Sequence, residues 1–289
     1  MSGTEEGARG GWRAVLAVVW RRKVVTASLA ILLLMAFLAV FADWVSPHSP
    51  TAIRAARRLR PPSTVNWFGT DEYGRDLFTR VILGGRTSLL IGALTVLFSC
   101  FFGTILGMIG GYFRRVDMLV NRVIDAMMAF PDILLAITLI SVLRPSASSV
   151  VVALGIVYTP RVARVARAST LVVRELAFID AARVLGVPTW RILLSHVLPN
   201  ISSPLIVQGT FIYAYAILAE AGLSYLGAGV SPEIPTWGGI INAGQQYIGR
   251  APWLMWFPGL FIAVSVFSLQ LAGDALRDVM DPRLRREAS

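Results

Sequence analysis

The stretch RELAFIDAARVLGVPTWRILLSHVLPN, residues 174–200, is an amphipathic, arginine-bearing segment between long apolar runs. Over 174–185 its apolar and charged residues alternate at mostly helical spacing, which predicts an amphipathic helix. Gly186 lets the backbone take a positive φ and end that helix, and Pro188 suits the first turn of a second helix, where a missing N–H costs nothing. The segment therefore predicts two short helices that meet at a glycine elbow, with a stop at Leu198-Pro199.

Composition places this segment in a membrane protein. Hydrophobic residues make up 55% of the 289 residues, charged residues make up 15%, and the mean hydropathy is +0.65. A soluble domain carries roughly 25% charged residues. A window of about 20 residues, the length that crosses a hydrocarbon core of ~30 Å, finds six apolar stretches. They lie near 24–42, 88–112, 119–143, 147–168, 201–219 and 253–273. We therefore expect an all-α polytopic membrane protein with six transmembrane helices.

Two of these spans have distinctive features. Basic residues precede the first span, as in a signal peptide, but the run over 24–42 exceeds a signal h-region and no small-x-small cleavage site follows it. We expect a retained anchor there. The fourth span is interrupted by Pro160 and Arg161, and a tilted or proline-kinked helix would account for this.

The distribution of arginines predicts the orientation, because basic side chains are retained on the cytoplasmic side during insertion. With the N-terminus inside, four cytoplasmic segments hold 18 of the 27 Lys and Arg residues. These segments are 1–23, 113–122, 161–200 and 274–289. The external loop 43–87 carries seven arginines and is an exception that its acidic residues only partly offset. We expect both termini in the cytoplasm, and a core over 88–273 that holds the second to sixth spans.

Several classes of activity lack the residues they need. Lys23 is the only lysine, and no glycine-rich phosphate-binding loop precedes it, so the chain by itself has no motif for ATP hydrolysis. His48 and His196 are expected on opposite sides of the membrane, and Cys100 is alone in a span, so no metal site is expected. The basic residues flank the membrane without an aromatic-interleaved patch, which favours anionic lipid headgroups over nucleic acid. No catalytic or cofactor-binding residue is predicted.

Charged and polar residues within the spans are candidates for the lining of a bundle interior or a water-filled cavity. In a straight third helix, Asp132 would lie roughly 15 Å beyond the inner boundary, near the bilayer midplane, beside the carbonyl that Pro131 leaves free. Such carboxylates normally face a bundle interior or a water-filled cavity. A packing aspartate bonded to neighbouring backbone is the equal alternative. Gln208 and Glu220 in the fifth span are further candidates, although Glu220 suits a structural role in holding the turn after it.

Arginines recur every three residues at the inner end of the fourth span, at positions 161, 164 and 167. This spacing places them on one helix face. Arginines that reach anionic lipid headgroups are the simpler interpretation, and direct contact with a cytoplasmic partner is the alternative.

The external segments are expected to lie at the membrane interface. The loop with Pro232, Pro235, Trp237 and Trp253 predicts an interfacial cap with an aromatic belt, a surface on which an external protein could sit. In the first loop, 54–60 predicts a solvated or headgroup-facing run, and 69–76 a turn followed by an interfacial helix. Contact with a partner subunit is the functional alternative for that loop.

Five motifs carry a family resemblance. The pattern Asp180-Ala181-Ala182-x-x-x-Gly186, followed by Leu198-Pro199, resembles the cytoplasmic "EAA" loop of permease subunits in ABC importers, with Asp180 where glutamate is usual. Four further stretches look like the C-type permease subunit of dipeptide/oligopeptide importers. They are FGTDEYGRD at 68–76, AFPD at 129–132, EAGLSYLG at 220–227, and GDALRD at 273–278 with DPR at 281–283. Together the motifs cover about 66–286.

The resemblance implies a type I importer core in the cell membrane, paired with a second, homologous permease subunit. It also implies two cytoplasmic ATPase subunits that bind ATP and Mg, and an external substrate-binding protein. The residues expected to form the ATPase-coupling loop are Asp180, Ala181, Ala182, Arg183, Gly186, Pro188, Leu198 and Pro199. The residues expected on the translocation path are Pro131, Asp132, Gln208 and Glu220.

Other interpretations remain open at this point. The coupling loop is alternatively a membrane-surface helix without a partner, although such helices usually lack a glycine break. The cargo is alternatively a nickel chelate, glutathione or a glycoside. A secondary transporter would need an inverted repeat and paired broken helices, and only the Pro131-Asp132 interruption is visible. A structural scaffold would leave a membrane-embedded carboxylate without a purpose.

Overall fold

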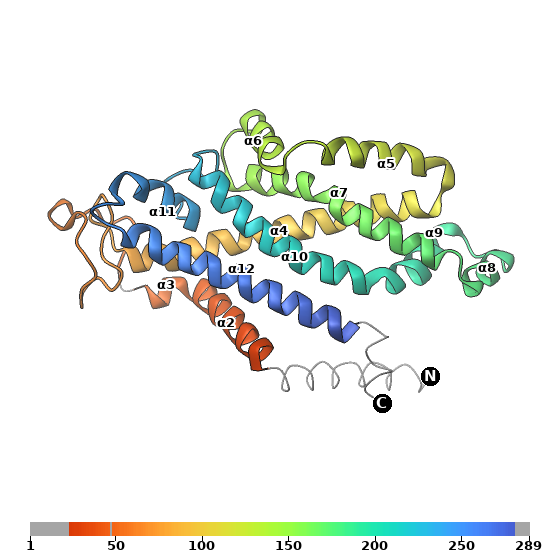
Figure 1. The fold of residues 1–289 in the computed structure, drawn as a ribbon, viewed down its shortest axis with the longest axis horizontal. Coiled ribbons are helices and arrows are strands. Elements are labelled where there is room, and N and C mark those ends of the chain that lie inside the picture. Colours follow the sequence, from red (N-terminus) through yellow and green to blue (C-terminus); the bar gives the residue numbers. More distant parts are fainter. Residues whose placement is uncertain (1–22, 47, 281–289) are drawn as a thin grey trace.

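A computed structural model describes residues 23–46 and 48–280, and the regular elements in that part of the chain are all helical apart from one isolated bridge between Thr70 and Asp76. The long helices run side by side along one axis (Figure 1). They are α2 (Lys23–Val40), α4 (Leu77–Tyr112), α7 (Ala147–Val173), α10 (Leu198–Tyr225) and α12 (Trp253–Met280). The shorter ones are α3 (Ala42–Val45), η1 (Ala55–Arg57), α5 (Arg114–Met128), α6 (Asp132–Leu143), α8 (Ala177–Val184), α9 (Thr189–Arg191), η2 (Ile192–Val197), α11 (Trp237–Gly244) and η3 (Gln245–Tyr247).

Within the described residues, five helices are long and apolar enough to cross a membrane. The α5–α6 pair makes a sixth if it is counted as one span, but it is bent by 93° at its break. The expectation of a continuous third helix over 119–143 is therefore wrong. Pro131 explains the break, because it has no N–H and disfavours helical backbone at Phe130 before it.

Several expected boundaries are also wrong. α4 begins at Leu77 and not at 88, because Asp76 caps it by accepting a hydrogen bond from the Thr79 N–H at 2.9 Å. The non-helical part of the expected loop 43–87 thus ends at residue 76. α7 continues through Pro160 to Val173, so the first part of the expected loop 161–200 is helix. The expected cytoplasmic tail begins inside α12, and residues 1–22 and 281–289 lie outside the described residues.

The tightest contact in the bundle joins α4 to α7 and depends on glycines. A Cβ added at Gly103 would lie 2.5 Å from Val162 Cβ, and one at Gly107 would lie 2.4 Å from the Ala163 carbonyl oxygen. Small residues four apart let two helix backbones approach closely in a membrane, where packing and not hydrophobic burial drives association. α4 and α7 therefore form the spine of the bundle.

The α5–α6 pair lies alongside α7, and two groups of short elements lie at opposite ends of the spine (Figure 1). α8 and α9 project at one end, which we call the α8 end. α11 and the segment 46–76 lie at the other, the α11 end. α2 runs from near the middle of the bundle toward the α11 end, and α12 runs from the α11 end toward the α8 end.

Candidate coupling and translocation site

The expected coupling segment, residues 174–200, contains one amphipathic helix, α8. It starts after Leu176, so the residues from Arg174 belong to the end of α7 and a short turn, and the predicted start at 174 is wrong. Ile179 and Ala182 are buried and belong to the core cluster that also contains residues of η2. Ala182 therefore packs inward, and of the expected Ala181-Ala182 docking pair only Ala181 faces outward.

The exposed side of α8 ends in an apolar tip. Val184 and Leu185 are 88% and 82% exposed, whereas Ile179 and Ala182 on the other side of the helix are 0% and 8% exposed. The N–H of Gly186 then bonds to the carbonyl of Arg183 and that of Val187 to the carbonyl of Ala182, both at 3.0 Å. This is the Schellman helix ending, and Gly186 has φ +74°, which confirms the predicted glycine elbow.

Two arginines attach the coupling segment to the end of α4. Arg174 Nη1 donates to the Gly111 carbonyl at 2.7 Å, and Arg183 Nε donates to the Tyr112 hydroxyl at 3.2 Å. Arg183 also pairs with Asp180 at 2.9 Å, so this carboxylate already has a basic partner within its own helix. The Tyr112 hydrogen bond raises the pKa of Arg183, and Asp180 adds to that effect.

The second part of the segment is more continuous than predicted. Pro188 caps α9, and α9 leads through the wide turn of the π-helix η2 directly into α10. Leu198-Pro199 is therefore not a stop, because both residues lie in the first turn of α10. The ring of Pro199 would clash with the carbonyl four residues earlier in a regular helix, and the π-helical turn before it relieves that clash.

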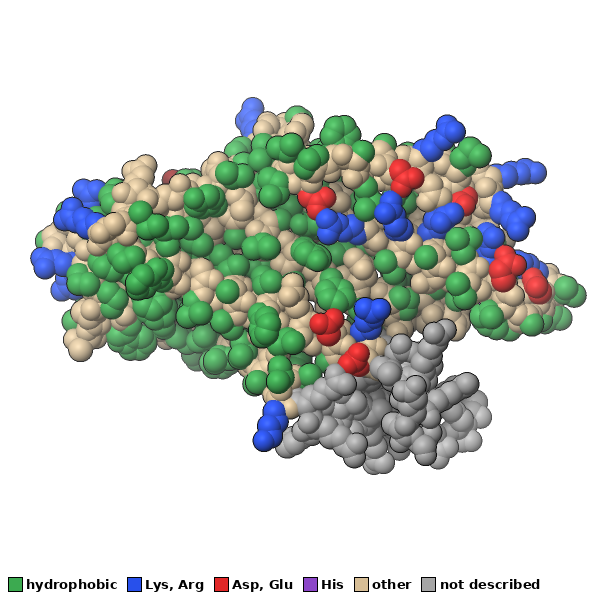
Figure 2. Space-filling view, in the orientation of Figure 1, with side chains coloured by type: hydrophobic (Ala, Val, Ile, Leu, Met, Phe, Trp, Pro, Cys, Tyr) green, Lys and Arg blue, Asp and Glu red, His purple; other side chains and the backbone are tan. Residues whose placement is uncertain are grey.

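Three ion pairs join α7 to the α5–α6 pair. Arg167 binds Asp117 through hydrogen bonds of 2.5 and 2.7 Å, Arg164 binds Asp125 at 2.8 Å, and Arg161 binds Asp132. Figure 2 shows acidic and basic side chains alternating over this part of the surface, beside a largely apolar middle. The arginines at 161, 164 and 167 were expected to contact lipid headgroups or a cytoplasmic partner. Both expectations are incomplete, because each arginine pairs with an aspartate of the same chain.

The ion pair of Arg161 and Asp132 lies beside the break between α5 and α6. Asp132 is the first residue of α6, where the helix dipole favours a carboxylate. The carbonyl that Pro131 would leave free is that of Met127, four residues earlier, and it accepts from the Phe130 N–H at 3.4 Å. The depth estimated for Asp132 on a straight helix does not apply, because the helix is not straight.

The two α10 candidates differ in environment. Gln208 is half-buried. Glu220 is fully buried, and its oxygens accept hydrogen bonds from Ser88 of α4 and Ser224 of α10, each at 2.8 Å. Glu220 does not reach interfacial water as a helix-end residue would. It ties α10 to α4, and through the Trp237 N–H on Ser88 also to α11.

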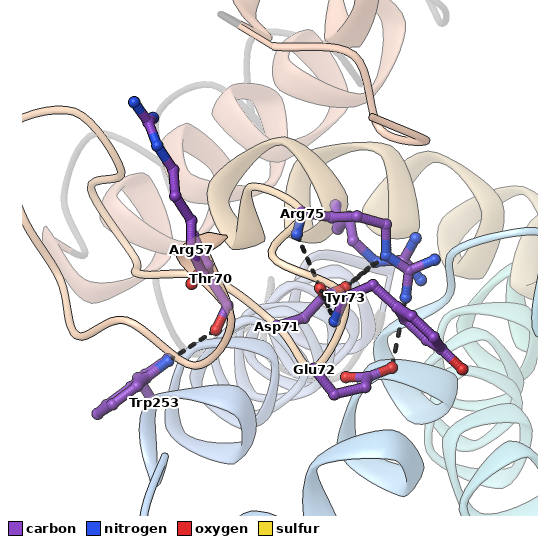
Figure 3. A network of polar contacts seen from close by, with 8 residues as sticks. Arg57, Thr70, Asp71, Glu72, Tyr73, Arg75 and Trp253 are labelled. Carbon is purple, nitrogen blue, oxygen red and sulfur yellow. Dashed lines mark hydrogen bonds and ion pairs between the residues drawn. The ribbon is translucent and has the colours of Figure 1, made fainter. Parts of the chain in front are cut away.

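At the α11 end, the 68–76 motif forms a rigid turn around Asp71 (Figure 3). Asp71 accepts from the backbone N–H groups of Tyr73 and Arg75 at 2.9 Å and binds the Arg75 Nε at 2.6 Å. Arg80 lies 3.5 Å from the same carboxylate. Gly74 is required here, because a Cβ on it would lie 2.0 Å from a backbone oxygen. The turn leads straight into α4, so the predicted interfacial helix is the first part of that span.

The same end carries a cavity of 640 Å³ between this turn, the 227–236 loop and α11. Glu72 lines the cavity, and burial raises its pKa. The predicted aromatic belt is wrong for Trp237, which is 1% exposed and donates to the Val81 carbonyl at 2.9 Å. Trp253 donates to the Thr70 carbonyl at 3.2 Å (Figure 3), so it braces the turn.

Comparison with known proteins identifies the family. The family model described as "Binding-protein-dependent transport system inner membrane component" matches residues 103–286, and the one described as "N-terminal TM domain of oligopeptide transport permease C" matches residues 11–62. The chain belongs to the binding-protein-dependent transport permeases. It is thus the non-catalytic membrane component of an ABC transporter.

Curated relatives match this permease over nearly its whole length. It is 39% identical to the dipeptide transport system permease protein DppC of Alkalihalophilus pseudofirmus, over 95% of this chain and 90% of that protein. It is 40% identical to the di/tripeptide transport system permease protein DppC of Pseudomonas aeruginosa, over 90% of this chain and 88% of that one.

The fold is also found in a solved ABC transporter. A chain of the MetNI methionine ABC transporter in an inward-facing conformation superposes with a TM-score of 0.59, over 70% of the permease and 97% of that chain, at 21% identity. This likeness shows the fold of the permease alone.

Sequence reasoning missed most of the contacts that organise the permease. The aspartates at 117, 125 and 132 are spaced by two helical turns, which would have flagged a common face opposite the arginines of α7. The anchoring of Arg174 and Arg183 on α4 had no local signal, because the partners lie 63 and 71 residues away.

Proposed function

We propose that this permease is one of two homologous subunits that form the passage of an ATP-driven importer for short peptides. The family supports the importer, and the dipeptide and di/tripeptide permeases among its relatives support the cargo. A nickel chelate, glutathione or a glycoside stays the alternative cargo. ATP and Mg would be bound by two separate ATPase subunits, and cargo would be delivered by an external binding protein.

The observation that carries the proposal is the apolar tip of α8. Val184 and Leu185 are almost fully exposed on a helix whose other face is buried, at the end of the bundle. Exposed apolar residues grouped in this way mark a surface that another protein covers. We assign that surface to the ATPase subunits, with Asp180, Ala181 and Arg183 beside it.

The same segment supports a mechanism of coupling. α8 packs against η2, which leads directly into α10, and its Arg183 is held to Tyr112 at the end of α4. A displacement of α8 by ATPase closure would therefore move the helices that line the bundle. The Schellman turn at Gly186 keeps α8 and α9 at a fixed angle, as a lever requires.

The orientation we propose places the α8 end and both termini in the cytoplasm. Arginines at the α8 end fit this arrangement. The exceptional arginine content of the first external loop is partly explained, because Arg75 and Arg80 are occupied by Asp71 inside the protein. The cavity near Glu72 would then face the outside, where the binding protein docks.

The test is a pull-down of the assembled complex. Leu185→Asp should reduce recovery of the ATPases with the tagged permease while membrane insertion is unchanged, since the side chain touches little in the permease itself. Ile248→Asp, at an apolar site that is 59% exposed in the segment after α11, is the control and should retain the ATPases. Full recovery of the ATPases with Leu185→Asp would remove α8 from the interface.

A further inference from the structure

The charged pair of Arg161 and Asp132 lies deep in the membrane-spanning region. Along α7, Arg161 is about 21 Å from the Ala147 end and about 18 Å from the Val173 end, at a rise of ~1.5 Å per residue. Its side chain is 33% exposed and that of Asp132 is 37% exposed. An exposed guanidinium at this depth cannot be left against lipid hydrocarbon without a large cost. The surface in front of it must therefore be water or a polar partner.

Arg161 also has hydrogen-bonding capacity to spare. A guanidinium carries five N–H donors. Among the hydrogen bonds of residues 23–46 and 48–280, it makes one, from Nη2 to Asp132. In a membrane interior every donor needs an acceptor. The remaining donors are thus available to a ligand.

Two tyrosines hold this guanidinium in place. Its Cζ lies 5.3 Å from the ring centroid of Tyr158, one helical turn earlier in α7, and 5.4 Å from that of Tyr215 in α10. The Tyr158 hydroxyl donates to the Tyr215 carbonyl at 3.4 Å, which ties the two helices at this level. Cation–π contact with two rings orients a planar cation without using its N–H donors.

α10 carries a second polar residue, Gln208, within the membrane-spanning region. Gln208 precedes Tyr215 by seven residues and so lies on the same helix face, about 10 Å nearer the α8 end. Tyr215 is 43% exposed and Gln208 is half-buried. Phe211 and Ile212 lie between Gln208 and Tyr215 on that face, so Gln208 is a second, separate polar position of α10 beside the site formed by Arg161 and Tyr215.

We propose that Arg161, oriented by Tyr158 and Tyr215, binds the carboxylate of peptide cargo on its way through the permease. This rests on the proposed function as a peptide importer. Arginine suits the task because its planar fork matches a carboxylate. Asp132 keeps the site neutral between transport events, so an incoming carboxylate shares Arg161 with it and is held weakly. Weak binding lets the cargo leave again, as conduction demands.

The experiment measures access and charge preference at this site in the complete importer. In a Cys100→Ala background, Tyr215→Cys is treated with an anionic and with a cationic water-soluble methanethiosulfonate, each rate normalised to that of a free thiol. The reaction is run without nucleotide and with MgATP and vanadate. Gln208→Cys provides a second position, and Leu33→Cys on the exposed apolar face of α2 is the control.

The anionic reagent should react with Tyr215→Cys faster than the cationic one, because the Arg161 guanidinium lies 5.4 Å from the ring of Tyr215 and has N–H donors to spare, while its pairing with Asp132 limits the preference to a few-fold. Arg161→Gln combined with Asp132→Asn leaves no charge unpaired and should abolish the preference, whereas Arg161→Lys should retain it. The proposal would be overturned if Tyr215→Cys and Gln208→Cys both reacted as slowly as Leu33→Cys, with and without MgATP and vanadate. Lipid or a partner subunit would then cover the site. Equal rates for the two reagents would overturn the carboxylate site.

Uptake separates this proposal from the one it rests on. Wild-type proteoliposomes should take up radiolabelled dialanine, and Arg161→Gln/Asp132→Asn should slow that uptake several-fold. Absence of dialanine uptake by the wild type, with the anionic preference intact, would overturn the peptide cargo and support an anion site. Unchanged uptake in the double variant would overturn the role of Arg161 in carrying cargo.

Discussion

Arg183 in α8 and Tyr112 at the end of α4 are joined twice, by a hydrogen bond of 3.2 Å to the tyrosine hydroxyl and by a guanidinium that lies 5.1 Å from the centre of the ring. The contact connects the expected ATPase-docking helix to the longest helix of the bundle. It therefore offers a direct route for motion from the coupling segment into the membrane.

We expect Tyr112→Phe to weaken this connection. The lost hydrogen bond is worth about 0.5–1 kcal/mol, so uptake per ATP hydrolysed should fall by roughly two- to fivefold while insertion persists. The permease provides its own control at the opposite end, where Arg58 donates to the Tyr247 hydroxyl at 3.1 Å. Tyr247→Phe should leave coupling unchanged. Equal effects of the two variants would contradict a specific role for the α8 contact.

Substitutions at Gly186 should separate backbone strain from crowding. A Cβ at this position meets no atom within 4 Å, so only φ +74° opposes a side chain. A residue other than glycine in this conformation costs about 1–2 kcal/mol, and a β-branched residue costs more. Gly186→Val should uncouple ATP hydrolysis from uptake while insertion is intact, and Gly186→Asn, which tolerates left-handed backbone, should stay close to wild type. Normal uptake by Gly186→Val would refute the lever.

The ion pairs of α7 predict a graded series. Asp125 is 65% exposed, and exposed pairs contribute about 0–1 kcal/mol, so Asp125→Asn should have little effect on uptake. Asp132→Asn leaves Arg161 without its partner between the two tyrosines and should slow uptake more than it lowers the yield of assembled complex. Both quantities are measured on the same purified importer. Unaltered uptake with Asp132→Asn would remove this residue from the path.

Local patterns predicted the parts of the fold that depend on local chemistry. The long apolar runs indicated the spans, and Gly186 indicated the elbow, because a positive φ favours glycine wherever it occurs. Boundaries failed where capping or proline geometry decided them. Asp76 caps the start of α4 in a stretch that Arg75 and Arg80 make polar, so hydropathy placed the start of the span too late. Pro199 lies within the first turn of α10 because a π-helical turn precedes it, and hydrophobic periodicity does not reveal such a turn.

The contacts of the candidate site were less accessible to sequence reasoning. Asp132 was singled out for its charge, but the break at Pro131 and the partner Arg161 depend on how α6 folds back against α7. Tyr158 and Tyr215 drew no attention, since an isolated aromatic residue in a span is usually packing. Only the arrangement of α7 beside α10 brings their rings to the same guanidinium.

Glu220 supplies the last prediction, because it is a fully buried carboxylate whose hydrogen bonds come from two serine hydroxyls. Glu220→Ala removes both acceptors and should cost about 1–3 kcal/mol in the stability of the detergent-solubilised complex, measured by thermal unfolding. Glu220→Gln keeps the shape and a carbonyl acceptor, and its amide can donate to the second serine oxygen, so its Tm should stay close to that of the wild type. A Gln variant as unstable as the Ala variant would show that the negative charge itself is needed. A stable Gln variant that has lost uptake would instead place Glu220 on the translocation path, where its tie between α4, α10 and α11 would be part of transport.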